Sequence, residues 1–172
     1  FHPYPFQQKL VSSFHDNRFT ICKLPRQSGK SVVTTAYLIH QAIFRDNINI
    51  AILANKRETS FELMAKLQTS YEHLPKWLQQ GVLAWNKGSI ELENGSRITA
   101  SSTSSSAVRG FSYNIVMLDE FAFVPTNIAD DFFSSVYPTI SSGKSTKVIM
   151  VSTPNGMNHF YKLWNDAEKG RN

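Results

Sequence analysis

The sequence predicts an α/β fold with a mainly parallel central sheet flanked by helices and a small β-hairpin added to it. Short, nearly all-apolar segments, typical of strands covered on both faces, alternate with amphipathic segments of helical period. An Asn94-Gly95 pair between two strand-like segments is a strong short-range signal of a hairpin. Such alternation favours βαβ units, whose ligands bind beyond the carboxyl ends of the strands.

The first half of the chain contains two strand-like and two helix-like segments. The strands are rich in branched apolar residues, and the helices carry apolar residues three and four positions apart. Asn55, followed three residues later by Glu58, predicts a capped helix start. The expected strands cover 19–24 and 48–54, and the expected helices cover 29–44 and a segment that includes 61–71.

The second half of the chain is predicted to contain a serine-rich loop, a hairpin and several short strands and helices. Five serines and one threonine over 101–106 predict a flexible loop, because they offer no apolar anchor to a core. The hairpin is expected to join strands over 89–93 and 97–100, with another short strand before it. The remaining predicted elements are strands over 81–85, 115–118 and 147–151 and helices over 130–136 and 157–164.

Length, charge and cysteine content limit the classes of protein to which this chain can belong. The 172 residues suit one domain over 1–172, and 18 Lys and Arg against 13 Asp and Glu give a net charge of +5. That charge permits a polyanionic partner without requiring one. A single cysteine, Cys22, excludes an internal disulfide framework, and no apolar run reaches the roughly 18 residues of a membrane span. We therefore expect no membrane partner.

The segment Leu24-Pro25-Arg26-Gln27-Ser28-Gly29-Lys30-Ser31 predicts a phosphate-binding loop between the first strand and the first long helix. Gly29 allows a tight turn that points successive backbone N–H groups, including those of Gln27 and Ser28, at an anion. Lys30 is expected to reach the terminal phosphates of a nucleotide, and Ser31 to offer a hydroxyl to Mg²⁺. Leu24 stands where the usual pattern has its first glycine, so an ordinary strand-to-helix turn is the alternative.

Arg26 is an unusual residue inside such a loop. Its guanidinium can stabilise the charge that spreads over a transferring phosphoryl group, or it can be a solvated surface charge. We assign it to ATP binding and catalysis.

Two carboxylates follow the apolar segment 115–118. Acids at the end of a buried strand are costly unless a cation or a reaction uses them. We predict that Asp119 holds Mg²⁺ and that Glu120 accepts the proton of an attacking water, which favours hydrolysis. A strand that leaves the core into a polar turn is the alternative.

Polar side chains also follow the last strand and precede the first. Ser152 and Thr153 can contact a terminal phosphate and report the state of the nucleotide to neighbouring elements, although they also suit a simple turn. In the run Tyr4-Pro5-Phe6-Gln7-Gln8, an aromatic ring can stack on a base and an amide can hydrogen-bond the adenine edge, although Pro5 also suits the first turn of a helix.

Taken together, these segments resemble the ATPase domain of the large terminase subunit of tailed bacteriophages, of the myovirus type. The resemblance extends over nearly the whole chain. The runs that carry it are Arg26-Gln27-Ser28-Gly29-Lys30-Ser31, Trp85-Asn86-Lys87-Gly88-Ser89-Ile90-Glu91-Leu92, Ala107-Val108-Arg109-Gly110, Asp119-Glu120-Phe121-Ala122-Phe123 and Thr153-Pro154-Asn155-Gly156, followed by Asn158-His159-Phe160-Tyr161.

The resemblance implies a P-loop NTPase fold of the RecA-like (ASCE) kind and a set of roles. It implies a deviant phosphate loop without the first glycine, an arginine finger in cis at Arg26, adenine recognition by Gln7, and coupling of hydrolysis to DNA movement through Ser152 and Thr153. It also implies Mg²⁺-dependent ATP hydrolysis that drives double-stranded DNA into a procapsid.

The same resemblance implies a biological setting. The partners would be ATP, double-stranded DNA, a portal protein, a small terminase subunit and other copies of the chain in a ring, all in the cytoplasm of the host cell. Because the family's proteins are longer, we expect this chain to be one ATPase subdomain of a longer protein, weakly active by itself.

Three other functions stay open at this point. A helicase-type ATPase has the same order of strands, loops and helices, but such proteins often continue the acidic pair with Ala-Asp or Ala-His, unlike Phe121-Ala122-Phe123. A nucleotide-binding switch would not require Glu120. A nucleic-acid-binding protein without nucleotide would not require Lys30.

Overall fold

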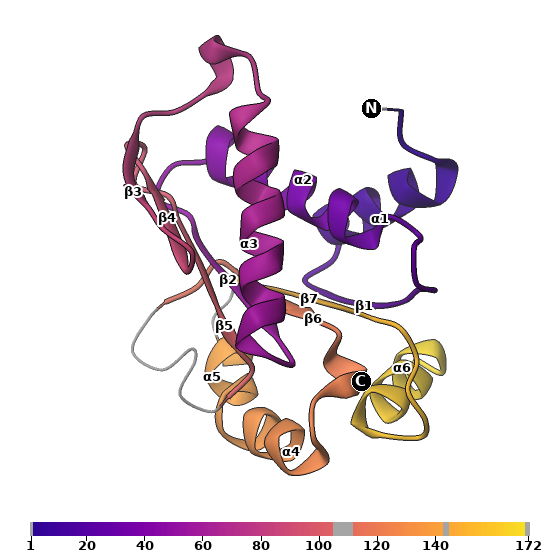
Figure 1. Cartoon of the computed structure of the whole chain (residues 1–172). Helices are drawn as coiled ribbons and strands as arrows, with labels where there is room; N and C mark the ends of the chain where they lie inside the picture. The colour runs from indigo at the N-terminus through magenta and orange to yellow at the C-terminus, as the bar shows by residue number, and fades with distance from the viewer. Residues whose placement is uncertain (1, 105–111, 143–144, 171–172) are drawn as a thin grey trace.

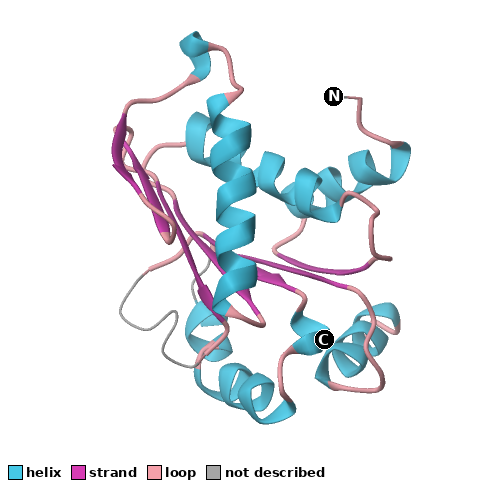
Figure 2. Ribbon diagram, viewed as in Figure 1, coloured by secondary structure: helices cyan, strands magenta, loops and turns pink. Residues whose placement is uncertain are grey.

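The computed structural model describes residues 2–104, 112–142 and 145–170. The chain forms three layers, in which α1, α2 and α3 cover one face of a twisted sheet and α4, α5 and α6 lie on the other side (Figure 1). Figure 2 shows the same layers by type of secondary structure. The expected Ala107-Val108-Arg109-Gly110 run and the end of the serine-rich segment lie outside the described residues.

Seven strands in the order β1-β7-β6-β2-β5-β4-β3 make one sheet. The first five in that order are mutually parallel, and β4 and β3 add to the edge in antiparallel fashion. The strands are β1 (Phe19–Lys23), β2 (Asn49–Ala54), β3 (Val82–Trp85), β4 (Ser89–Leu92), β5 (Arg97–Ser102), β6 (Ile115–Asp119) and β7 (Lys147–Ser152). The α/β class and the mainly parallel sheet are thus confirmed.

Six α-helices and two short 3₁₀ turns are present among the described residues. The helices are α1 (Pro5–Asp16), α2 (Lys30–Phe44), α3 (Arg57–Glu72), α4 (Thr126–Ser135), α5 (Tyr137–Ser142) and α6 (His159–Glu168), and the 3₁₀ turns are η1 (Lys76–Leu78) and η2 (Phe121–Phe123). No helix in the described ranges combines the length and the apolar character that crossing a bilayer requires.

Successive side chains of the central strands point to opposite faces of the sheet and pack into two separate hydrophobic cores. On β2, Ile50 and Ile52 pack with α1, α2 and α3, whereas Ala51 and Leu53 pack with η2, α4, α5 and α6. This two-sided burial explains why the strands are continuous apolar runs.

The hairpin forms where it was predicted and becomes part of the main sheet. Gly95 has a positive φ of 80°, which the tight turn requires, and β4 pairs with β5 in antiparallel fashion. On its other side β5 pairs with β2 in parallel. This pairing extends β5 to Ser102, so the first two serines of the expected loop are in a strand.

Three helices have other boundaries than predicted, and one helix was not predicted. The helix α3 begins after Lys56, whose side chain makes no cap hydrogen bond, so the capping box of Asn55 and Glu58 does not form. The helix α4 begins four residues before the predicted start, directly after Pro125, because Ile128 and Ala129 in its first turn pack on the core. The helix α6 covers His159–Glu168 instead of 157–164, and the short helix α5 was not predicted.

Candidate functional site

The carboxyl ends of three neighbouring strands bring the predicted residues to one edge of the sheet. Because β7 lies between β1 and β6, Lys23 is level with Ser152, and Asp119 is level with Val151. The phosphate loop leaves β1, the acidic pair leaves β6, and the two hydroxyl residues leave β7. Residues from three distant parts of the sequence therefore meet at this edge.

The predicted phosphate loop has the backbone that its sequence suggests. Gly29, with a φ of 76°, is the residue before the first turn of α2, and Gln27 also has a positive φ of 60°. A Cβ atom on Gly29 would lie 2.7 Å from the side-chain nitrogen of Gln7. Glycine suits this position, because side chains rarely adopt this backbone conformation and a Cβ would have to displace the end of the Gln7 side chain.

Lys30 and Glu120 form an ion pair across the site, although they are 90 residues apart. Lys30 is 8% exposed, and its Nζ atom donates to Oε1 of Glu120. The other oxygen, Oε2, accepts from the Thr153 hydroxyl at 3.0 Å, from the Thr153 N–H at 3.3 Å and from the Ser152 hydroxyl at 3.4 Å. The phosphate-loop lysine, the predicted base and the predicted coupling residues thus form one hydrogen-bonded group.

These donors keep Glu120 ionised. Burial opposes its ionisation, but the hydrogen bond and charge of Lys30 and the two donors of Thr153 outweigh burial and lower its pKa. Its backbone has a positive φ of 50°, which is uncommon for a residue with a side chain. Such conformations are concentrated at functional sites, where the surrounding structure holds them in place.

Asp119 has the opposite electrostatic environment. It is buried, and its Oδ1 atom has no hydrogen-bond partner among the described residues. Burial, and then the charge of Glu120, raise the pKa of its carboxyl to about 6 against the opposing charge of Lys30. A buried carboxylate oxygen without a partner fits a Mg²⁺ ligand.

A metal at Asp119 would need other ligands. The described part of the chain holds no group of three or more His, Cys, Asp or Glu side chains that could bind an ion. Ser31, in the first turn of α2, is half-buried and supplies the second predicted ligand. The remaining oxygens would come from a nucleotide and water, as is usual for Mg²⁺.

Gln7 is buried beneath the phosphate loop. Its Oε1 accepts from the N–H of Tyr4 at 2.9 Å, and its Nε2 donates to the Ser28 carbonyl at 3.4 Å. A hollow of about 430 Å³ beside the loop is lined by Tyr4, Phe6, Leu24, Pro25, Gln27 and Ser28, and Gln7 is not among its lining residues. The rings of Tyr4 and Phe6 stack there, with centroids 6.1 Å apart and planes 9° from parallel.

Arg26 is in the same loop, and its side chain is exposed. It forms no hydrogen bond or ion pair within the described ranges, so the structure does not bring it to Glu120. Ser28 is tied to the loop by its hydroxyl, which donates to the Pro25 carbonyl at 2.9 Å.

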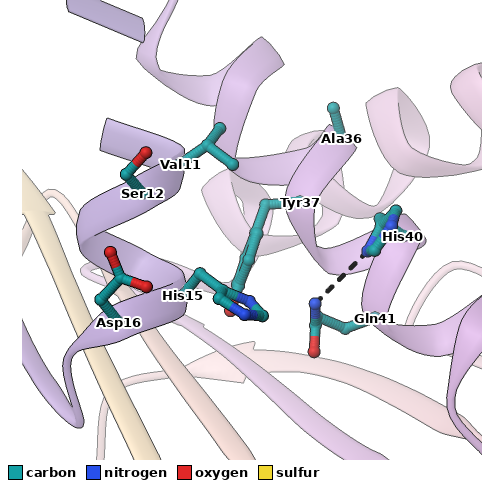
Figure 3. Close-up of a pocket in the computed structure, with 8 residues that line it drawn as sticks. All are labelled: Val11, Ser12, His15, Asp16, Ala36, Tyr37, His40 and Gln41. Carbon is teal, nitrogen blue, oxygen red and sulfur yellow. Dashed lines mark hydrogen bonds between the residues drawn. The ribbon is translucent and has the colours of Figure 1, made fainter. Parts of the chain in front are cut away.

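Another hollow, of about 410 Å³, lies between α1 and α2 (Figure 3). None of the predicted site residues lines it. The lining residues are Val11, Ser12, His15 and Asp16 of α1 and Ala36, Tyr37, His40 and Gln41 of α2.

Several solved structures share this fold, among them three large terminases. The large terminase of bacteriophage HK97 is 22% identical with a TM-score of 0.80 over 100% of this chain and 38% of its own. The large terminase ATPase domain of Thermus phage P74-26 is 21% identical with a TM-score of 0.68, over 95% and 69%. The large terminase of a thermophilic bacteriophage in complex with ADP is 14% identical with a TM-score of 0.72, over 98% and 44%. The chain thus spans well under half of the HK97 protein.

The sequence itself matches one family model from residue 21 to residue 172. The description of that family is "Terminase large subunit, T4likevirus-type, N-terminal". The matched segment includes the phosphate loop, the acidic pair and the two hydroxyl residues. On this match the chain belongs to the T4likevirus-type family of terminase large subunits, whose N-terminal part it represents.

Proposed function

We propose that this chain hydrolyses ATP to drive double-stranded DNA into a viral procapsid. The observation that carries the proposal is the contact of Lys30, Thr153 and Ser152 with the carboxylate of Glu120. A phosphate-binding lysine, a general base and hydroxyl residues at one strand edge are the components of ATP hydrolysis. Family membership, and the complexes of the thermophilic phage terminase with ADP and ATP-gamma-S, support a nucleotide as the ligand.

The phosphate loop binds the triphosphate. The N–H groups of Gln27, Ser28 and Gly29 face the phosphates at the positive end of α2, and Lys30 contacts the terminal one. Arg26, which is exposed in the same loop, turns toward the γ-phosphate and stabilises its charge. Gln7 contacts the adenine base, as the family resemblance implies, and the stacked rings of Tyr4 and Phe6 line a hollow beside the loop in which the base can lie.

Glu120 is the general base. It takes a proton from water as the water oxygen bonds to the γ-phosphorus and the bond to the β–γ bridging oxygen breaks, which leaves ADP and phosphate. The terminal phosphate competes with Glu120 for Lys30. As Lys30 moves to the phosphate, the carboxylate loses a hydrogen-bond donor and becomes more basic. Asp119 and Ser31 would hold Mg²⁺, which when bound neutralises charge on the phosphates.

The wider setting follows from the family. We propose that Ser152 and Thr153 couple hydrolysis to DNA movement, and that the chain works in a ring with a portal protein and a small terminase subunit in the host cytoplasm. We also propose that the chain is a subdomain of a longer protein. By itself it then hydrolyses ATP slowly and binds DNA weakly, in a salt-sensitive manner.

Turnover of ATP by the full-length gene product with Mg²⁺ tests the proposal. We expect Glu120→Gln to lower kcat by about a hundredfold or more while binding of ATP-gamma-S persists, because only proton transfer is lost. We expect Lys30→Ala to lose both binding and turnover. The matched controls are Glu62→Gln and Lys162→Ala, which change exposed residues of α3 and α6.

The outcomes separate the alternatives. Unchanged turnover in Glu120→Gln would show that this carboxylate is not the base. Nucleotide binding without any turnover in the wild type would indicate a switch module. Equal binding of ATP-gamma-S by Lys30→Ala and wild type would exclude a phosphate role for this loop.

A further inference from the structure

The 3₁₀ turn η2, which directly follows Glu120, is held in place by contacts with the start of helix α6. Directly after Glu120 the chain forms η2, and the peptide of Ala122 in this turn is buried. Its N–H donates to the Ser152 hydroxyl at 3.1 Å. The same hydroxyl has two acceptors for its one proton, the Thr153 carbonyl at 2.9 Å and Oε2 of Glu120 at 3.4 Å. The Ser152 hydroxyl therefore lies between the Ala122 N–H and the carboxylate of the proposed base.

The carbonyl of Ala122 points to the loop between β7 and α6. It accepts from Nδ2 of Asn158 at 2.6 Å and from Nδ2 of Asn155 at 3.2 Å. Asn158 is also the N-cap of α6, since its Oδ1 accepts from the N–H of Tyr161 at 3.2 Å. The side-chain oxygen of Asn158 thus caps α6, and its side-chain nitrogen donates to the Ala122 carbonyl.

Aromatic packing ties the same turn to α6 and α4. Phe121 is buried, and its ring contacts those of Phe133 and His159 in an edge-on manner at 5.4 and 6.5 Å. His159 stacks on Phe133 at 4.5 Å, and its Nδ1 lies 3.0 Å from Oδ1 of Asp130. A shift of α6 therefore cannot leave η2 in place.

We infer that Asn158 is a positioning residue for Glu120, which it holds through the backbone of Ala122 and through Ser152, so that helix α6 controls the hydrolysis step. The inference rests on the proposed role of Glu120 as the base. Asn158 does not touch the reacting atoms. It holds the turn that directly follows the carboxylate, and small displacements of a base can lower a rate by orders of magnitude.

Two substitutions at Asn158 remove its donor to Ala122, together with the hydrogen bond of the same nitrogen to the Asn155 carbonyl at 2.9 Å. Asn158→Asp and Asn158→Ser both keep an oxygen that can cap α6, and both lose the nitrogen that donates to Ala122. The matched control is Asn127→Asp, the same chemical change at an exposed position of α4. Kinetics of the full-length gene product, thermal melting and the stoichiometry of ATP-gamma-S binding are measured for each.

We expect both Asn158 variants to lower kcat by roughly tenfold, with KM within about twofold of wild type and full binding stoichiometry. Asn127→Asp should match the wild type. Because Ser152 and Asn158 hold the two backbone groups of the same residue, Ala122, Ser152→Ala combined with Asn158→Asp should lower kcat by less than the product of the two single effects.

Other outcomes overturn the inference. Wild-type kcat in both Asn158 variants overturns it, and so does a loss of kcat that only parallels a lower stoichiometry of binding, because that indicates misfolding. If Glu120→Gln abolishes turnover in the same assay, the proposed function stands although the inference fails. If Glu120→Gln turns over normally, the proposed function fails, and the inference fails with it.

Discussion

The two adjacent carboxylates of the site have different protonation behaviour, although only one peptide bond separates them. Glu120 is held ionised by Lys30 and Thr153, whereas burial raises the pKa of Asp119 to about 6. Pairs of acids whose environments separate their pKa values are characteristic of catalytic sites. Burial of the ionised Asp119 carboxylate lowers the free energy of unfolding unless a cation compensates for its charge.

Because burying the ionised carboxylate of Asp119 is unfavourable, we predict that Asp119→Asn stabilises the fold near pH 7. The folded pKa of about 6 lies above the ordinary value of 3.8, so the protonated form favours folding. The resulting stability is present below about pH 4 and is lost as the pH rises through 6. In EDTA, urea unfolding at pH 7 should show Asp119→Asn to be more stable than wild type by about 2–3 kcal/mol, and the difference should shrink toward pH 4.

Asp131→Asn, at an exposed position of α4, is the matched control and should leave the free energy of unfolding unchanged. A lower stability of Asp119→Asn at pH 7 would mean that the wild-type carboxylate has a stabilising partner in the fold.

At the scale of elements, the phosphate loop and helix α1 depend on each other. Gln7 of α1 contacts Ser28 and fills the space that a side chain on Gly29 would need. The helix α1 is further attached to α2, because the Tyr37 hydroxyl donates to the Phe14 carbonyl at 3.1 Å. The loop conformation therefore depends on an element that precedes it in the sequence.

This dependence predicts that Gly29→Ala lowers stability more than Gly156→Ala does. Both glycines have a positive φ, of 76° and 71°, so both substitutions introduce a backbone strain of about 1 kcal/mol. A Cβ at Gly156 has nothing within 4 Å, whereas one at Gly29 meets Gln7 at 2.7 Å, and this overlap should add roughly 1–3 kcal/mol.

Thermal melting of the two variants measures the difference. Adding Gln7→Ala to Gly29→Ala should recover part of the stability, because it removes the atom that the new Cβ meets. Equal melting temperatures of Gly29→Ala and Gly156→Ala would contradict the close packing of α1 on the loop.

At the scale of the whole molecule, the site depends on β1, which is an edge strand of the sheet. Within the described part of the chain β1 pairs only with β7, and on the face that carries Cys22 it is covered by the core with α1 and α2. Cys22, the only cysteine in the sequence, is in this strand, 7% exposed and level with Val151. Burial raises its pKa to about 11. Its thiol therefore reports the opening of the strand that leads into the phosphate loop.

We predict that a thiol reagent modifies Cys22 slowly at pH 8 in the folded chain and at least a hundredfold faster in urea. The thiolate is scarce at that pH, and reaction requires opening of the sheet. ATP-gamma-S with Mg²⁺ should slow the reaction further, because a ligand that binds the folded state suppresses opening. Cys22→Ser provides the background rate. Modification of the folded chain at the rate seen in urea would show that β1 is not packed as described.

Local patterns allowed much of the fold to be predicted. The strands β2, β6 and β7 are continuous apolar runs because both faces are covered, and Asn94-Gly95 identified its hairpin because few residue pairs suit that turn. The predictions failed where packing overrides pattern. The strand β5 continues into serines because β2 offers it hydrogen bonds, and the short α5 has too few residues for a period to show.

The sequence by itself determined the class of fold and the strand ends after which the proposed phosphate loop and the acidic pair lie, because backbone conformation and strand burial depend on residues close together in the chain. Only the tertiary structure placed β7 between β1 and β6, paired Lys30 with Glu120, and connected Ala122 to Asn158. Strand order and contacts across 36 to 90 residues depend on how whole layers pack. The pattern of residues that are close together in the sequence does not predict that packing.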